Sequence, residues 1–352
     1  MLHQYEDFKR VFQNHCSPIE ADTDFALNLL RQQDLSEPIV LSPLSITMSC
    51  ASLGMCTEGK TKKQIVKALF PSKNYSISFL PYWIDKYREM IDLYEYSQLS
   101  GQVNFATHFH VIHDLKRRHY PIRGFAREFV TNFNEKTETA EIINSKMSEM
   151  TRTQITDIVT PDGIEEDADV ILASGTQVTG CWKDEFDSKE TTAGEFYSSP
   201  YSKRSVYYLS KQFTTEIAQD GVLQVVRIKF QDESFSLDVF LPREQFGLKA
   251  VLKNLTMDTI QELYKKFKDQ LVHVKIPKFR TETKLDLTDS LNTLGVRRVF
   301  KSGKAQLGTN RTIREKFERL FHSNSTNKLR CLSQMPHKAV LEVRVSRLIY
   351  IS

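Results

Sequence analysis

The segment Gly54–Thr61 carries the first pattern that could do chemistry, G-x4-G-K-T, the spacing of a loop that cradles nucleotide phosphates. That chemistry needs a buried strand before the first glycine and a later apolar strand ending in an aspartate that reaches magnesium. The residues before Gly54 instead read as a capped helix, and the apolar run Val170–Ala173 is followed by Ser174. We interpret the pattern as a chance match and keep a P-loop nucleotide hydrolase only as an alternative.

Three histidines, His108, His110 and His113, lie close together in the chain. In a strand the first two share a face, as metal ligands would, but no cysteine or carboxylate at a useful spacing completes a site. The sequence contains no G-x-S-x-G elbow, and no serine, histidine and aspartate can be nominated together as a triad. We therefore expect no metal, no cofactor and no enzyme activity.

A local basic patch with two interleaved aromatic residues is the remaining candidate binding site. Its cationic members are Lys116, Arg117, Arg118, Arg123 and Arg127. A charged helix surface exposed to solvent is the favoured interpretation, and a polyanion-binding site is the alternative.

The composition limits the class of protein. The chain has 352 residues and a net charge of +4, which is too small and too dispersed for an extended nucleic-acid groove. No stretch approaches the length of a membrane span, and the N-terminal residues 1–19 have no apolar run typical of a signal peptide. The five cysteines show no paired spacing. These features predict a cytoplasmic protein without nucleic-acid or membrane partners.

The elements that would position any site begin with a capped, buried helix. Ser42 lies where an N-cap belongs, Pro43 is at the first helical position, and Leu44–Leu53 contains no charge. Gly54 can end this helix, and Thr61–Gln64 forms a capping box for the next one.

Helix candidates follow at Phe125–Phe133, Ile143–Ile158 and Asp286–Leu294, the last ending at Gly295. Strands are expected from Val170 onward, over Ser234–Leu241, and over the alternating residues around Val274. Helices come first and strands crowd the later half, which favours an α+β fold. No linker or repeat divides residues 1–352, so we expect a single domain.

Six groups of characteristic residues follow one another in a fixed order along the chain. They are Ile39–Ile46 with Ser52–Gly54; Ile143, Asn144, Thr151 and Ile155; Trp182, Phe186, Thr191 and Phe196; Phe240–Pro242; Pro277–Phe279 through Leu294–Gly295 and Phe300 to Ala305–Gly308; and His337–Leu341. In this order they resemble the serpin family of serine protease inhibitors, over roughly 25–343. Each match alone is weak, but together they are specific.

The resemblance implies a serpin-like fold of N-terminal helices and large mixed or antiparallel sheets. It also implies a polar shutter in the core, with Ser42, Pro43, Ser45, Ser174 and His337 as its members here. Ser174 departs from the asparagine that is usual in the family, and the stretch 309–330 is longer than the family equivalent. Taken singly, each of these residues is also explained as an ordinary satisfied polar residue of a core.

Inhibition in the family is a mechanical trap, in which a cleaved loop inserts as a new strand of the main sheet and drags the acyl-linked protease with it. The hinge and reactive loop are absent after Val343, and the atypical tail 344–352 spans at most about 30 Å. We therefore expect a chain that lacks the reactive loop and the last C-terminal strands, that ends in a free tail and that does not inhibit. The tail would be a protease substrate at best.

Two further expectations follow from the tail. Open sheet edges would favour self-association, and the β-prone run Leu348–Ile351 could patch such an edge. Val345-Ser346 can be encoded by a sequence that opens an intron, so we hypothesise a longer isoform, and only that isoform would have a serine or cysteine protease as its partner. An extracellular location is the family-based alternative to the cytoplasm, and a polyanion- or protein-binding module is the alternative function.

Overall fold

The structure is a computed structural model. It describes residues 18–55, 57–71, 80–85, 89, 103–114, 126–131, 133–151, 155–164, 170–233, 235–306 and 331–351.

The helices, in chain order, are α2 (Pro18–Leu30), α3 (Pro43–Met55), α4 (Gly59–Leu69), α6 (Lys136–Met150), α7 (Leu248–Asn254), α8 (Met257–Tyr264) and α9 (Thr288–Thr293). The strands are β1 (Val103–Asp114), β2 (Ala126–Thr131), β3 (Val170–Cys181), β4 (Thr192–Ser199), β5 (Ser202–Gln219), β6 (Leu223–Lys229), β7 (Ser236–Pro242), β8 (Lys268–Asp286), β9 (Leu332–Gln334), β10 (Pro336–Val343) and β11 (Arg347–Ile351).

Most strands belong to one path of hydrogen-bonded neighbours, β2-β1-β3-β11-β10-β8-β5-β6-β7, with β4 paired to β5 and β9 to β3. The pairs β1·β2 and β3·β9 are parallel, and the others are antiparallel. Strand β8 joins two parts of this path, because residues 268–278 pair with β5 and residues 279–286 pair with β10. The helices and the large, mostly antiparallel sheet confirm the α+β prediction.

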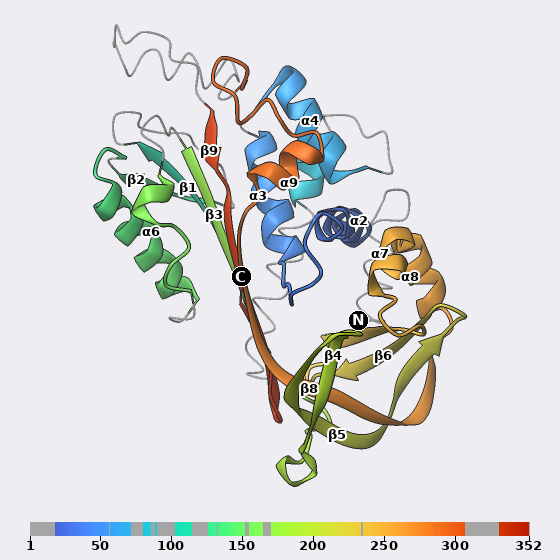
Figure 1. Cartoon of the computed structure of the whole chain (residues 1–352). Helices are drawn as coiled ribbons and strands as arrows, with labels where there is room; N and C mark the ends of the chain where they lie inside the picture. The colour runs from blue at the N-terminus through green and yellow to red at the C-terminus, as the bar shows by residue number, and fades with distance from the viewer. Residues whose placement is uncertain are drawn as a thin grey trace, which may run out of the picture.

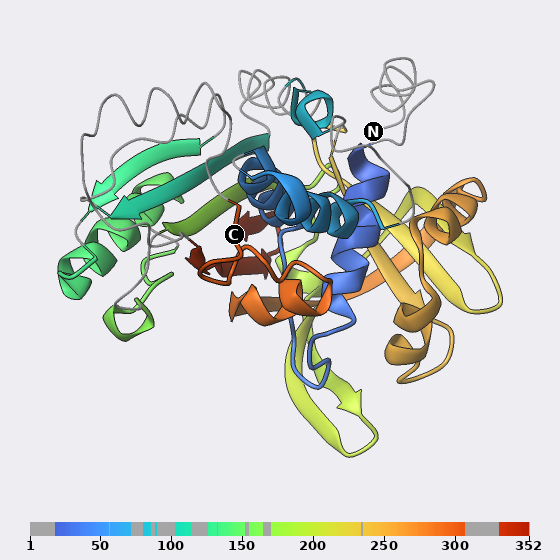
Figure 2. The same ribbon diagram turned by 90° about the horizontal axis from the view of Figure 1, so that it is seen from above.

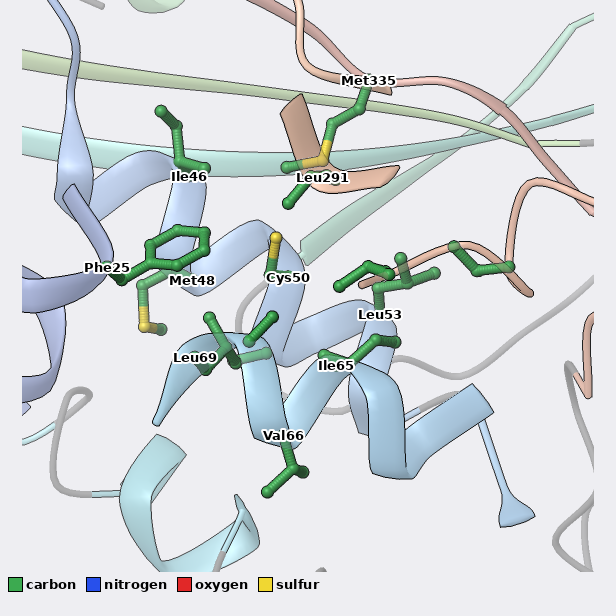
Figure 3. Packing of buried hydrophobic residues seen from close by; sticks show 14 of the residues in the cluster. Phe25, Ile46, Met48, Cys50, Leu53, Ile65, Val66, Leu69, Leu291 and Met335 are labelled. Atoms are coloured by element: carbon green, nitrogen blue, oxygen red, sulfur yellow. The ribbon is translucent and has the colours of Figure 1, made fainter. Parts of the chain in front are cut away.

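Helices cover both faces of the central strands (Figure 1). On one face, Ala140, Ile143 and Met147 of α6 share a cluster with Ile171 and Ala173 of β3. On the other face, α3 and α4 share a cluster with residues from β3, β9 and α9, among them Leu172, Leu332 and Leu291. Figure 3 shows Ile46, Met48, Cys50 and Leu53 of α3 packed against Ile65, Val66 and Leu69 of α4. The alternation along β3 therefore places it between two helical layers.

Helix α3 has the predicted character. Every residue from Ser45 to Gly54 is buried, as an uncharged helix requires. The predicted N-cap is present, because Ser42 Oγ accepts a hydrogen bond from the amide of Ser45 at 3.3 Å. Gly54 does not end the helix. It packs closely instead, since a Cβ at that position would lie 2.6 Å from Leu80 Cδ2.

Two helix predictions need correction. The predicted helix Phe125–Phe133 contains strand β2, which pairs in parallel with β1. Helix α6 begins before Ile143 and ends at Met150, and the hydroxyl of Thr151 accepts a hydrogen bond from the amide of Ile155 at 3.0 Å. The last predicted helix is confirmed as α9, and Gly295 follows with a φ of 95°.

The expectation of a free tail is wrong. Residues 347–351 form β11, which lies between β3 and β10 and pairs antiparallel with both. Figure 1 marks the C-terminus in the middle of the central sheet. The run Leu348–Ile351 is a strand, as its β-prone residues predict, but it fills an interior position and does not patch an edge.

Candidate functional site between β3 and β10

Residue pairing with both neighbouring strands defines the position of β11. Leu348 lies opposite Gly180 of β3 and Val343 of β10, and Ile351 lies opposite Gln177 and Val340. Each backbone edge of β11 therefore has a neighbouring strand over these rows.

A tight turn joins β10 to β11 and is bound to the segment after β3. The amide of Arg344 donates to the carbonyl of Arg347 at 3.0 Å, which closes the turn. Trp182 donates twice, from its indole Nε1 to the carbonyl of Arg344 at 3.0 Å and from its amide to the carbonyl of Ser346 at 3.1 Å. The amide of Phe186 donates to the carbonyl of Val345 at 3.2 Å. These bonds attach the turn to a part of the chain that precedes β4.

Aromatic packing supports the same region. Trp182 is fully buried, and its ring stacks on Phe230 with centroids 4.9 Å apart and an interplanar angle of 7°. Leu348 of β11 is 5% exposed and belongs to the same apolar cluster. Gly180 leaves room for this packing, because a Cβ there would lie 2.7 Å from the Phe230 ring.

The structure brings together four of the five predicted shutter residues. Pro43 begins α3 directly after Ser42, and Ser42 and Ser45 are joined by their hydrogen bonds. The amide of Ser42 donates to Nε2 of His337 in β10 at 3.2 Å. Ser42, Ser45 and His337 are each at most 1% exposed. The contact joins the start of α3 to the strand beside β11.

The fifth predicted residue, Ser174, lies in β3 opposite Phe109 of β1. Its side chain is not among those described. Gln177 of β3 and Val340 of β10 lie opposite the same residue of β11, Ile351. Ser174 and His337 each come three residues earlier in these two strands, so they lie at the same level of the sheet.

Burial controls the protonation of His337. Desolvation lowers its pKa from 6.5 to about 4, because the charged imidazolium loses its water and gains no carboxylate. Its Nε2 accepts the Ser42 hydrogen bond, so the ring is neutral there. The other ring nitrogen, Nδ1, is buried without a hydrogen-bond partner among the described residues.

Lys338, the next residue of β10, is also buried, but its pKa shifts in the direction that favours the charged form. Burial alone would lower its pKa, but its hydrogen bonds to Asp157 and Glu282 raise the pKa above the ordinary value. The ammonium lies 2.6 Å from Glu282 Oε1 and also contacts Asp157 Oδ1. The lysine is 4% exposed, so the two carboxylates pair a charge that burial would otherwise disfavour.

In the segment with the phosphate-loop pattern, backbone amides are hydrogen-bonded to another part of the chain. Helix α4 begins at Gly59, two residues before the predicted capping box, and Glu58 provides no side-chain cap. The side-chain oxygen of Gln306 accepts instead, from the amide of Lys60 at 2.9 Å and more weakly from Thr61 at 3.4 Å. The amides that would cradle a phosphate are therefore used within the chain, and the segment before them is helix α3. The structure overturns the P-loop alternative.

The other candidate sites are only partly described. Lys116, Arg117, Arg118 and Arg123 lie outside the described residues. Arg127 lies in β2, opposite His110 of β1, and not on a helix. The three clustered histidines all lie in β1, where His108 and His110 share a face.

Sequence reasoning missed a polar pair on the surface of the sheet. Ser210 Oγ of β5 lies 2.7 Å from Nε2 of His273 in β8. No carboxylate of the described residues is bonded to the other ring nitrogen, so the pair lacks the third group that orients a catalytic histidine. Strand alternation would have placed both residues on the exposed face, but their register could not be read from the sequence.

Sequence reasoning also missed a buried charged cluster. Arg227 makes two hydrogen bonds of 2.8 Å to the carboxylate of Asp238, and its Nη1 lies 3.4 Å from Oε2 of Glu216. Its guanidinium also lies over the rings of Tyr264 and Phe267, 5.1 and 4.5 Å from their centroids. Burial lowers the pKa of Arg227, but the two carboxylates outweigh this effect and raise it overall. The cluster holds α8 against β6.

No helix in the described part of the chain is long and apolar enough to cross a membrane.

Comparison with known proteins decides the family. The family model described as "Serpin (serine protease inhibitor)" matches residues 20–346. The chain belongs to the serpin family. This serpin is 28% identical over 342 residues to a serine protease inhibitor of Mus musculus, covering 92% of this chain and 72% of that relative. It is 24% identical to serpin B6 of Macaca fascicularis, over 92% of this chain and 85% of the relative.

Solved structures of low sequence identity share the fold. Emu ovalbumin aligns with a TM-score of 0.79 and 17% identity, covering 96% of this serpin and 89% of ovalbumin. A cleaved serpin 42Da aligns with a TM-score of 0.80 and 19% identity, covering 94% and 86%. The serpin-like fold expected from the sequence is therefore confirmed.

Proposed function

We propose that this serpin does not trap proteases in the conformation described and acts instead as a non-inhibitory binding protein. One observation carries the proposal. Strand β11 already occupies the position between β3 and β10, paired on both sides. The trap requires a cleaved loop to enter the main sheet as a new strand. Residues 177–181 of β3 are already paired with β11, so an inserted strand cannot pair there until β11 leaves.

The contacts of the turn support this proposal. Three hydrogen bonds from Trp182 and Phe186 hold the carbonyls of Arg344, Val345 and Ser346. The backbone directly after β10 is therefore bound to the body of the protein. A bait loop must be presented to a protease, whereas this segment turns back at once.

We further propose that Ser42, Pro43, Ser45, Ser174 and His337 act together as a shutter. The buried hydrogen bond from the amide of Ser42 to Nε2 of His337, which joins the start of α3 to β10, supports this role for the two residues. Residues 1–352 would act as one domain, since the described strands form a continuous path. Cys50 and Cys181 form no disulfide bond among the described residues, which supports a reducing, cytoplasmic compartment.

The test is incubation with elastase, chymotrypsin or trypsin at increasing molar ratios. We expect no complex that survives SDS electrophoresis and no loss of protease activity. The leukocyte elastase inhibitor of Equus caballus, 26% identical to this chain over 312 residues, provides the parallel positive control with elastase. An SDS-resistant complex of this serpin with any of these proteases would overturn the proposal.

A further inference from the structure

Helix α4 and residues 296–306, which follow α9, lie beside each other on the surface although they are far apart in the sequence. The side-chain oxygen of Gln64 accepts a hydrogen bond from the amide of Arg298 at 2.9 Å. One turn earlier in α4, the amide of Lys60 donates to the side-chain oxygen of Gln306, also at 2.9 Å. Figure 2 shows α4 in blue near the orange segment that follows α9. The two glutamines therefore hold this segment against the helix at two points.

The side of α4 that faces solvent is cationic. Lys60, Lys63 and Lys67 are all exposed, whereas Ile65 and Leu69 are buried on the opposite side of the helix. Residues at positions i, i+3 and i+7 share one face of a helix. The three lysines therefore form a row, which extends about 10 Å along the helix axis at roughly 1.5 Å per residue.

The neighbouring segment adds more positive charge. Arg297, Lys301 and Lys304 are exposed in it. We refer to these three residues and the three exposed lysines of α4 together as the cationic surface. No carboxylate of the residues that the structure describes forms an ion pair with any of its six members. Their charge is therefore available to a ligand.

The positive charge is concentrated here and is not a general property of the chain. Residues 58–69 and 296–306 contain eight lysines and arginines and one carboxylate, that of Glu58, which gives a local charge of +7. The whole chain carries only +4, so its remainder is net negative. The adjoining residues 307–330 contain six lysines and arginines against two glutamates, so they do not supply the missing negative charge. An anionic ligand from outside the chain would supply it.

We propose that the cationic surface binds a short acidic segment of a partner protein. In an extended segment, alternate residues lie about 7 Å apart. This spacing is close to the rise of about 6 Å between Lys63 and Lys67 on α4. Carboxylates on every second residue of the ligand can therefore face successive lysines. The inference rests on the proposed binding function, to which it adds a surface and a class of partner.

The charge distribution favours a short acidic peptide over other polyanions. A duplex nucleic acid or a long polysaccharide carries its charge past the cationic surface and meets the net negative remainder of the chain. A single-stranded nucleic acid needs aromatic rings on which its bases stack. The two segments contain one aromatic residue, Phe300, and it packs against the buried cluster around α3 and α4. A second copy of the cationic surface would bring like charges together.

The probe is a fluorescently labelled peptide, Glu-Ser-Glu-Ser-Glu-Ser-Glu, titrated with the full chain while anisotropy is recorded. We expect saturable binding that rising salt weakens. The double variant Lys63→Gln/Lys67→Gln should weaken binding about tenfold, because it removes two charges that face the ligand. Lys301→Gln/Lys304→Gln should do the same from the neighbouring segment. Thermal unfolding establishes that both variants are folded.

Helix α7 offers a matched control. Lys249 and Lys253 are also exposed and four residues apart on a helix. The double variant Lys249→Gln/Lys253→Gln therefore lowers the total charge by the same amount, but it should change the affinity less than about twofold. An equal loss in this control would show that the peptide responds to overall charge only, and it would overturn the inference.

A footprint on the unaltered chain tests the surface without any variant. Bound peptide should slow the acylation of Lys63, Lys67 and Lys301 by an amine-reactive ester, measured by mass spectrometry, and leave Lys253 unaffected. No saturable binding, no protection of these lysines, or tighter binding of a DNA duplex or heparin fragment of equal charge would overturn the inference. The protease assay contains no peptide, so the inference and the proposed lack of inhibition fail separately.

Discussion

The amide of Ser42 donates a hydrogen bond of 3.2 Å to Nε2 of His337, and this contact joins the N-terminus of the buried helix α3 to strand β10. Because both residues are at most 1% exposed, the acceptor must stay neutral for the bond to persist. The contact therefore makes the attachment of helix to sheet sensitive to acid.

We predict that stability falls as the pH drops from 6.5 toward 4. The pKa of His337 is about 4 when folded against 6.5 ordinarily, so the unfolded state takes up this proton first. The contribution of the neutral His337 to the free energy of unfolding is complete above pH 6.5 and is lost between pH 6.5 and 4. The loss is about 3 kcal/mol, at roughly 1.4 kcal/mol per pKa unit. Urea unfolding at several pH values measures the slope. The variant His337→Gln removes the titration and should show a flatter profile, and equal slopes would contradict the prediction.

We predict that Leu348→Ala destabilises the protein by about 2–4 kcal/mol, because it deletes a buried side chain between β3 and β10. Leu348 is 5% exposed and packs in the cluster that contains Trp182. Denaturant unfolding followed by tryptophan fluorescence measures the loss. The neighbouring Arg347 is exposed, so Arg347→Ala should change stability by less than about 0.5 kcal/mol. If both variants are neutral, β11 does not occupy its position in solution.

We predict that Arg227→Ala destabilises by about 3–5 kcal/mol, because it leaves the mostly buried carboxylate of Asp238 without its cation and leaves Glu216 only the more distant Lys229, at 3.5 Å. Asp238 and Glu216 have side chains only 14% and 13% exposed. Arg227→Lys should cost less, since it keeps the charge but loses the two-pronged contact with Asp238. Lys265→Ala removes the surface pair with Glu262 and is the control, with an expected effect below about 1 kcal/mol. Similar losses for Arg227→Ala and Lys265→Ala would show that the cluster does not contribute.

Local sequence signals predicted the elements whose structure is set locally. The uncharged run Leu44–Leu53, with Ser42 and Pro43 before it, specified a buried helix, and Gly295 specified the end of α9. The shutter contact was accessible only through the family resemblance, since nothing near Ser42 in the sequence points to His337.

Elements that depend on distant partners were not predictable in the same way. The residues around Phe129 have spacing compatible with a helix, but parallel pairing with β1 makes them a strand. The run Leu348–Ile351 was recognisable as β-prone, yet its neighbour Gly180 lies far earlier in the chain.

The position of β11 also constrains the order of folding. The β10–β11 hairpin closes a very short loop, so it can form quickly and by itself. Its pairing with β3 requires two segments to meet across a long stretch of chain, which carries a larger entropic cost and makes this the slower event. Docking of the finished hairpin onto β3 would then complete the central sheet, and conditions that delay this docking would leave β3 as a transient template for other extended chains.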